Sequence, residues 1–421
     1  MSTTHTIVIG AGQAGLATSH CLTDASVDHV VLERGRVADR WLGQTWESLR
    51  LLTPNWASRL PGWSYQGPQP DGFMTAAEFA GYLAGYAGSF DAPVEEHSGV
   101  RSLRRSDGGY TVDTDRGSWR ATNVVIATGW CDKPRVPEFA HRLPAGVAQI
   151  TPDAYRSPDE LPPGRVLVVG GSATGVQLAD ELARAGREVI LSAGNHSRLP
   201  RRYRGMDIWW WLDQTGTFAV TIDEVSDPAR ARAEGALQLI GREDHRDVDL
   251  PALQRLGVRL AGRMVDLDGN RAGFAPDLRT STDAADARLA RVLARIDDHI
   301  VRSGLDAEVL RPSSLARLRP EERLTRLDLH RERVGAVLWA TGYRRPYPWL
   351  QVPVLDGAAE IKHRRGVTPV AGLYVMGQRF QYRRDSNFID GVRHDAAYLA
   401  GHIAARAHHR SPAAAGPSVH R

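Results

Sequence analysis

The N-terminal stretch Thr6-Ile7-Val8-Ile9-Gly10-Ala11-Gly12-Gln13-Ala14-Gly15 decides the fold. Its apolar half predicts a buried strand, and the spacing Gly10-x-Gly12-x-x-Gly15 follows at once, with a helix expected from Leu16 onward. Gly10 permits the tight turn, Gly12 leaves space for a pyrophosphate, and Gly15 lets the helix pack on the strand. The free amides and the positive dipole at the helix N-terminus would hold the phosphates.

An acidic residue follows the next predicted strand at the expected distance. The strand His29–Leu32 ends at Glu33, about 20 residues beyond the glycines, where a carboxylate would bind a ribose diol. The alternative is a structural turn followed by a surface acid. Turn, helix and acid together predict a dinucleotide site.

The length and composition of the chain indicate a soluble globular protein with more than one domain. A chain of 421 residues suits two or three domains rather than one core. Hydrophobic residues make up 42% and charged residues 24%, as in a soluble globular protein. Lys133 and Lys362 are the only lysines, and the many arginines are dispersed among acids, leaving a net charge of +4. This pattern is typical of a GC-rich genome, so we expect no nucleic-acid partner.

No segment predicts a membrane anchor, export or a metal centre. No apolar run approaches the roughly 20 residues that span a bilayer, and the N-terminus enters a strand without a signal segment. We therefore expect a cytoplasmic protein. Cys21 and Cys131 form no CxxC pair and are too few for a metal cluster or a disulfide framework.

A second strand-glycine-helix unit begins at Arg165–Val169, followed by Gly170-Gly171-Ser172-Ala173-Thr174-Gly175. Ser172 replaces the middle glycine, which still leaves a small residue at the pyrophosphate. The next predicted strand, Glu188–Leu191, is followed by no acid. The second unit therefore repeats the first, with a different group expected at the ribose.

The residues after that strand predict the coenzyme. Ser192 stands at its end, and Arg198, Arg201 and Arg202 follow. An acid would repel the 2′-phosphate of NADPH, whereas a serine and guanidinium groups would bind it. The alternative is that these arginines line a solvated loop.

Two matching strand ends complete the pattern. Residues 123–129 and 335–343 are apolar strands that end in Ala127-Thr128-Gly129 and Ala340-Thr341-Gly342. We expect an α/β fold with two Rossmann-like dinucleotide-binding domains, the second inserted into the first. The expected divisions are an FAD-binding domain over 1–150, an NADPH-binding domain over 151–335, a return to the first domain over 336–410, and a disordered tail over 411–421.

The remaining segments are less specific. A long aromatic loop precedes an amphipathic helix, Ala76 to Tyr86, capped by Thr75, and a β-meander runs from Val100 to Arg120. The Trp209–Trp211 run could be a substrate wall, a subunit contact or interdomain core, of which we favour the last. A helical stripe from Leu289 to Ile300 predicts core rather than a cofactor site.

Paired glycine fingerprints with Ala-Thr-Gly strand ends make the chain resemble the two-dinucleotide-binding-domain flavoproteins. Within that group it is most similar to the short bacterial flavin-containing monooxygenases, through Arg40-Trp41, the segment 48–54, and Arg201 to Gly205. The resemblance implies FAD in the first site and NADPH in the second. It also implies that a flavin C4a-hydroperoxide transfers one oxygen atom from O₂ to a small substrate, at an amine nitrogen, a sulfur or a ketone.

The resemblance also implies site residues. Asn55, just after the Thr-Pro pair, is the candidate catalytic residue at the flavin edge. The expected cofactor-binding residues are Gly10, Gly12, Gln13, Ala14, Gly15, Glu33, Arg34, Arg40, Trp41, Leu52, Thr53, Val100, Ala127, Thr128, Gly129, Gly170, Ser172, Ala173, Thr174, Gly175, Ser192, Arg198, Arg201, Arg202, Ala340, Thr341, Gly342, Gly377, Gln378, Asn387 and Phe388.

The chain departs from the family pattern between its two domains. Phe139 lacks the glycine of the usual Phe-x-Gly run, and Tyr155-Arg156 stands where a histidine is expected. Gly377-Gln378 also lacks the acid that many related flavoproteins place on the ribityl chain.

Two other functions fit parts of the sequence. A flavin reductase or oxidase would pass electrons from NAD(P)H without oxygenating a substrate, although the absence of a CxxC pair argues against disulfide reduction. A redox sensor that binds FAD is the third class, and the second nucleotide site argues against it. A homodimer is left open.

Overall fold

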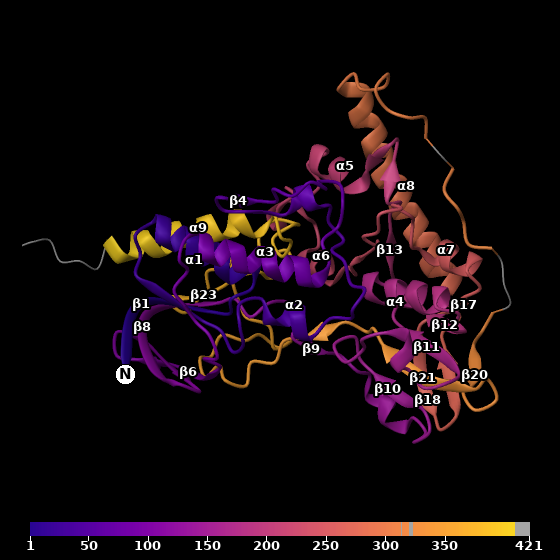
Figure 1. Ribbon diagram of the computed structural model, residues 1–421, viewed down its shortest axis with the longest axis horizontal. Coiled ribbons are helices and arrows are strands. Elements are labelled where there is room, and N and C mark those ends of the chain that lie inside the picture. Colours follow the sequence, from indigo (N-terminus) through magenta and orange to yellow (C-terminus); the bar gives the residue numbers. More distant parts are fainter. Residues whose placement is uncertain (313, 320–322, 409–421) are drawn as a thin grey trace, which may run out of the picture.

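The computed structural model describes residues 1–312, 314–319 and 323–408, and its two main sheets lie on opposite sides of the molecule (Figure 1). The expected tail over 411–421 lies outside the described residues. The first sheet takes strands from the beginning and the end of the chain, whereas the second takes its strands from the middle. This is the expected α/β fold with one Rossmann-like unit inserted into the other. The exact domain limits stay a prediction.

The first sheet has seven strands around β1 (Ser2–Ile9). On one side of β1 lie β2 (His29–Leu32) and β5 (Val94–Glu95), both parallel. On the other side is β8 (Gly117–Ile126), whose first half pairs with β7 (Gly109–Thr114), the partner of β6 (Val100–Ser106). Its second half pairs with β23 (Leu373–Val375). The third meander strand and the apolar strand after it are therefore one element, where the sequence predicted two.

Alternate residues of this sheet bury against different layers, because successive side chains of a strand point to opposite faces. Val8 packs toward α1 (Gln13–Asp24), α3 (Ala76–Ser89) and α9 (Val392–His408). Ile7 and Ile9 pack toward the meander. The expected cap of α3 is confirmed, since Thr75 and Glu78 form a reciprocal capping box.

The second sheet repeats this layout with five parallel strands. Its order is β10 (Ala148–Ile150), β21 (Val334–Trp339), β11 (Arg165–Val169), β12 (Val189–Ser192) and β17 (Arg259–Ala261). One face packs on α4 (Ala173–Arg184) and α7 (Leu250–Arg255). The other face packs on the three-stranded sheet β18 (Met264–Asp268), β19 (Arg271–Phe274) and β20 (Arg326–Asp328).

The chain crosses between the two units twice, and the crossings pair with each other. β9 (Lys133–Pro134) runs antiparallel to β22 (Tyr343–Arg344). Arg135 also donates its backbone N–H to the Gly342 carbonyl at 2.8 Å. The outgoing and returning segments are thus fastened side by side, directly after the two Ala-Thr-Gly triplets.

A third core lies between α5 (Ile208–Gln214) and the long helix α8 (Leu278–Arg302). Trp209 and Trp211 are buried there against the apolar stripe of α8, and Leu52 and Phe388 from the first unit pack on the same cluster. The predicted role of the helical stripe as core is confirmed. Trp209 and Trp211 also belong to this core, and Trp209 lines the pocket described below as well.

The remaining elements are short. They are α2 (Asp39–Gly43), β3 (Arg59–Leu60), β4 (Trp63–Ser64), β13 (Ser197–Arg198), β14 (Arg202–Tyr203), β15 (Met206–Asp207), α6 (Pro228–Ala233), β16 (Leu237–Gln238) and 3₁₀ turns at 55–57, 138–142, 158–160 and 222–224. Within the described ranges, no helix combines the length and apolar character needed to cross a bilayer.

A buried carboxyl group lies near the start of α9. Asp395 is 2% exposed, and its Oδ2 has no hydrogen-bond partner among the described residues. Burial is the main cause that raises the pKa of Asp395 to about 7, helped by the Asp385 carboxylate and opposed by a hydrogen bond from Ser386 and the charges of Arg365 and Arg383. The folded protein therefore keeps a proton that an unfolded chain releases near pH 4.

This proton predicts a pH-dependent stability. Because the folded state binds the extra proton between about pH 4 and pH 7, the Asp395 contribution to the free energy of unfolding falls as the pH rises through this window. Asp395→Asn has no such proton to lose, so its free energy of unfolding should lack this decline. Between pH 5 and pH 8, the free energy of unfolding of the unmodified protein should therefore fall by on the order of 2–3 kcal/mol relative to that of the variant. Urea unfolding at both pH values measures this. Asp107→Asn, in an exposed hairpin turn, is the control. The same pH dependence in all three proteins would contradict the assignment.

Candidate functional site: two glycine loops and their junction

The first glycine loop has the geometry of a dinucleotide site. Gly10 has φ of +108°, and a Cβ there would lie 2.6 Å from the Ala127 carbonyl oxygen. A Cβ on Gly15 would lie 1.8 Å from the Gly10 carbonyl oxygen, so α1 can meet β1 only through a glycine. A Cβ on Gly12 would meet nothing within 4 Å, which leaves the space that a pyrophosphate requires at the N-terminus of α1.

Glu33 joins this loop to the end of β2. Its carboxylate accepts hydrogen bonds from the Ala11 N–H at 2.7 Å and from the Gly35 N–H at 3.0 Å. It lines a cavity of about 400 Å³ that opens beside the glycine loop. The acid therefore lies where a ribose diol would meet it, and the cavity can hold part of a dinucleotide.

Many of the predicted cofactor residues line this one cavity. They are Gly10, Gly12, Gln13, Glu33, Arg34, Arg40, Trp41, Val100, Ala127, Thr128 and Gly129. Residues that the sequence reasoning missed line it too, among them Arg345, Tyr347 and Trp349. Arg345 is 8% exposed and stacks 3.6 Å from the Trp130 ring centre, and its Nε and Nη1 have no partner among the described residues. In the sequence, the one signal for Arg345, Tyr347 and Trp349 is their position just after the second Ala-Thr-Gly triplet.

The C-terminal return reaches the same loop. A Cβ on Gly377 would lie 2.9 Å from the Cβ of Ala14, so this glycine lets the chain pass against the first turn of α1. Gln378 follows and is buried. Asn387 has a buried Oδ1 without a partner among the described residues, which leaves an acceptor for a ligand.

The second glycine loop reproduces the first. Gly170 has φ of +123°, and a Cβ there would lie 2.2 Å from the Ala340 carbonyl oxygen. A Cβ on Gly175 would lie 1.7 Å from the Gly170 carbonyl oxygen, and Ser172 precedes α4 as its N-cap residue. Each glycine fingerprint thus meets its own Ala-Thr-Gly strand end, and the predicted pairing is confirmed.

The residues proposed to bind the 2′-phosphate are not available for it. Ser192 is buried in β12, where its Oγ donates to the Gly262 carbonyl oxygen and accepts from the Met264 N–H, both at 2.9 Å. Arg198 is 4% exposed and forms ion pairs with Asp249 and Asp286. Its charge is neutralised inside the protein, so the prediction for Ser192 and Arg198 was wrong.

The next two arginines lie at the short strand β14, beyond the end of β12. Arg201 is fully buried, pairs with Asp207, donates to the Leu52 carbonyl oxygen at 2.8 Å and lies over the Phe73 ring. Arg202 is exposed on the short strand β14, beside Arg201 rather than at the end of β12. Arg201 therefore joins the second unit to the loop of the first unit, which corrects its expected role, whereas the role predicted for Arg202 stays a prediction.

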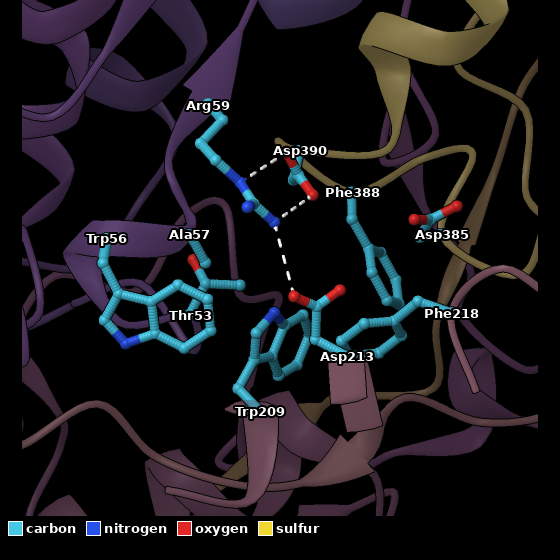
Figure 2. A pocket seen from close by; sticks show the side chains of 10 residues that line it. All are labelled: Thr53, Trp56, Ala57, Arg59, Trp209, Asp213, Phe218, Asp385, Phe388 and Asp390. Carbon is cyan, nitrogen blue, oxygen red and sulfur yellow. Dashed lines mark hydrogen bonds and ion pairs between the residues drawn. The ribbon is translucent and has the colours of Figure 1, made fainter. Parts of the chain in front are cut away.

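An aromatic pocket lies at the junction of the two units (Figure 2). Trp56, Trp209, Phe218 and Phe388 form its apolar walls, and Thr53 closes it. Arg59 crosses the pocket to make two hydrogen bonds to Asp390, at 2.9 and 2.7 Å, and an ion pair to Asp213 at 3.7 Å. The centre of a water molecule could occupy about 10 Å³ inside the pocket, which is room for about one water molecule.

Asn55 has a structural role in the long loop. The residue is 3% exposed, its Nδ2 donates to the Gln69 carbonyl oxygen at 2.9 Å, and its Oδ1 accepts from the Met74 N–H at 2.7 Å. Both ends of the amide close residues 55–74 into a compact loop. The expectation that Asn55 also faces the flavin edge as a catalytic residue stays a prediction.

The segment with the altered interdomain motif forms a contact of its own. Tyr155, in place of the expected histidine, donates to Glu181 at 3.3 Å, and Ser48 of the first unit donates to the same carboxylate at 2.6 Å. Burial raises the pKa of Glu181, although both hydrogen bonds oppose this. Arg156 donates to the Gly43 carbonyl oxygen at 2.7 Å. These residues hold the two units together.

The glycine geometry predicts opposite defects for two single substitutions. Gly12→Ala should leave the stability unchanged, because the new methyl group meets no protein atom, but should weaken FAD binding by on the order of tenfold or more, because it occupies the pyrophosphate space. Gly15→Ala should destabilise the fold itself by several kcal/mol, because its Cβ overlaps the Gly10 carbonyl oxygen. Flavin fluorescence titration and thermal unfolding of both variants separate the two effects. Equal loss of stability in both would contradict this account.

Comparisons with known proteins agree with this geometry. The family of pyridine nucleotide-disulphide oxidoreductases matches residues 7–207. The flavin-containing monooxygenase of Stenotrophomonas maltophilia has a similar structure, with a TM-score of 0.67 and 18% identity, over 97% of this chain and all of that one. At this identity the likeness establishes the shared fold.

Relatives in sequence identify the family. The indole-3-pyruvate monooxygenase YUCCA6 of Arabidopsis thaliana is 28% identical over 88% of this chain and 84% of its own. The oxidoreductase CzcO-like of Geobacillus kaustophilus is 32% identical over 94% of this chain and 97% of its own. The protein therefore belongs to the CzcO-like oxidoreductases, and it has the two Rossmann-like units of the flavoprotein fold that it shares with the flavin-containing monooxygenase.

Proposed function

We propose that this protein is an FAD monooxygenase that uses NADPH and O₂ to oxygenate a small organic substrate at an amine nitrogen, a sulfur or a ketone. One observation carries the proposal: the chain has two glycine loops of the same build, one in each unit, and an aromatic pocket lined by residues of both units. One loop suits a flavin dinucleotide and the other a nicotinamide dinucleotide. The chemistry requires both, because the nicotinamide supplies electrons that the flavin passes to oxygen.

The residues of the first unit fit FAD. Gly12 and the N-terminus of α1 offer space and amides to the pyrophosphate, and Glu33 offers a carboxylate to the ribose. Asn387 offers a buried free acceptor near the start of α9. Bound FAD would supply the redox chemistry, while the protein positions it and excludes water.

The aromatic pocket is the proposed substrate site. Its walls come from the loop of the first unit, from α5 and from the residues before α9, so a bound substrate touches both units. Four aromatic rings give an apolar surface, and Arg59 is held on one side by two carboxylates. Since the closed pocket admits little more than one water molecule, the rings of Phe218 and Phe388 must move when a substrate enters.

Oxygen incorporation tests the proposed activity. FAD-loaded protein is mixed with NADPH under ¹⁸O₂ and with a tertiary amine, a thioether or a ketone, each bearing a phenyl ring. At least one product should carry ¹⁸O, and the rate of NADPH consumption should rise with that substrate. NADPH consumption that yields only hydrogen peroxide with every compound would contradict oxygenation and support a reductase or oxidase instead.

The pocket assignment predicts a change in substrate range. Phe218→Ala removes a ring from the wall, so the rate with a bulky substrate relative to a small one should rise by on the order of tenfold. Trp349→Ala, at the cavity beside the first glycine loop, should leave this ratio unchanged while weakening FAD binding. An unchanged ratio in Phe218→Ala would place the substrate elsewhere.

A further inference from the structure

We propose that Arg263 is the residue that binds the 2′-phosphate of the coenzyme and selects NADPH over NADH. The proposal rests on the proposed use of a nicotinamide coenzyme in the second unit. It replaces Ser192, Arg198 and Arg201, whose polar groups are buried and engaged with protein atoms.

The internal repeat gives the position of the coenzyme ribose. In the first unit the Gly10 N–H donates to the Leu32 carbonyl oxygen at 2.8 Å, and in the second the Gly170 N–H donates to the Ser192 carbonyl oxygen at 2.9 Å. Ser192 is therefore the counterpart of Leu32. It follows that Ala193 is the counterpart of Glu33. The next residue, Gly194, is then expected beside the ribose of the coenzyme.

This position has no acid and little bulk. Ala193 is fully buried, and a Cβ on Gly171 would lie only 2.6 Å from its methyl group, so the glycine loop rests directly on it. The end of β12 therefore has no carboxylate that would pair with a ribose diol and repel a phosphate, and the nearby acid Asp277 instead pairs with Arg263. Gly194 leaves the space beside the ribose open to a neighbouring side chain.

Arg263 is that side chain. β12 and β17 run parallel with Ser192 opposite Ala261, so the two residues beyond each strand end, Gly194 and Arg263, lie side by side. A Cβ on Gly194 would lie 3.5 Å from the Cβ, Cγ and Cδ atoms of Arg263. The stem of the arginine thus runs along Gly194, at the end of the strand where the 2′-phosphate of NADPH is expected.

The backbone of Arg263 is fixed while its guanidinium is available. Ser192 Oγ bonds the backbone on both sides of Arg263, at the Gly262 carbonyl and the Met264 N–H. The Arg263 N–H donates to Asp277 Oδ1 at 2.9 Å. The Arg263 side chain is 68% exposed, and its ion pair with Asp277 spans 3.9 Å between Nε and Oδ2. Such a long, exposed pair is weak, so a doubly charged phosphate can compete for the guanidinium.

Another arginine near this strand end, Arg288, is less exposed than Arg263. It donates to the His196 carbonyl oxygen, and its Nε is buried without a partner among the described residues. The 2′-phosphate would therefore meet Arg263 as an accessible guanidinium positioned by a rigid backbone, which suits bidentate binding of a phosphate.

Binding to the FAD-loaded protein tests the inference without any oxygenation. Isothermal titration measures the dissociation constants of NADP⁺, NAD⁺ and 2′,5′-ADP for the unmodified protein, Arg263→Gln and Arg263→Lys. Arg263→Gln should weaken NADP⁺ and 2′,5′-ADP by on the order of 10- to 100-fold and leave NAD⁺ within about twofold. Arg263→Lys should fall between, because it keeps the charge and loses the planar fork.

A matched control and the separate outcomes complete the design. Arg259→Gln changes an exposed arginine at the opposite end of β17, where it pairs with Glu332 at 2.9 Å, and should alter neither affinity. If the unmodified protein binds neither NADP⁺ nor NAD⁺, the proposed coenzyme use fails. If it binds NADP⁺ and Arg263→Gln weakens both coenzymes equally, or neither, then Arg263 is not the 2′-phosphate ligand and the proposed function is untouched.

Discussion

Two contacts that leave no room for a Cβ atom govern this structure. At Gly15 and at Gly175, the first turn of a helix approaches the carbonyl of the glycine that ends the preceding strand, closer than any side chain would permit. Each contact fixes a helix N-terminus at the edge of a parallel sheet. The amides of that turn then point at one place, which is why both units present a ready site for a phosphate group.

A flavin bound in the first unit and a nicotinamide bound in the second could react only if the two units keep a fixed orientation. The two segments that connect the units pair with each other as β9 and β22, and buried polar contacts between the units add to this connection. Arg201 inserts a fully buried guanidinium between the units and pairs with Asp207, and Glu181 accepts hydrogen bonds from both units. Removing one partner of such a pair would leave an uncompensated buried charge, so neither partner is easily replaced.

In this arginine-rich chain, the location of an arginine is a poor guide to its partner. Arg198 and Arg201 follow a nucleotide-binding strand, yet they close internal ion pairs. Arg345 follows a strand of the other unit, yet it lines the cavity beside the first glycine loop. Tertiary folding places the guanidinium groups of Arg198 and Arg201 beside carboxylates and that of Arg345 at the cavity, although none of these partners is evident from the sequence.

The sequence by itself determined the elements that depend on local chemistry. The glycine spacings, the acid Glu33, the capping box at Thr75 and the apolar stripe of α8 are all governed by neighbours within a few turns of chain, and the structure has each of them as predicted. The repeat of the unit also predicted the inserted topology. Only the tertiary structure decided which strand ends meet, that Asn55 is used to close its loop, and that the charge beside Gly194 comes from Arg263, about 70 residues further along the chain. These depend on segments far apart in sequence, and a residue's hydrogen-bonding partners are fixed by the fold rather than by its neighbours along the chain.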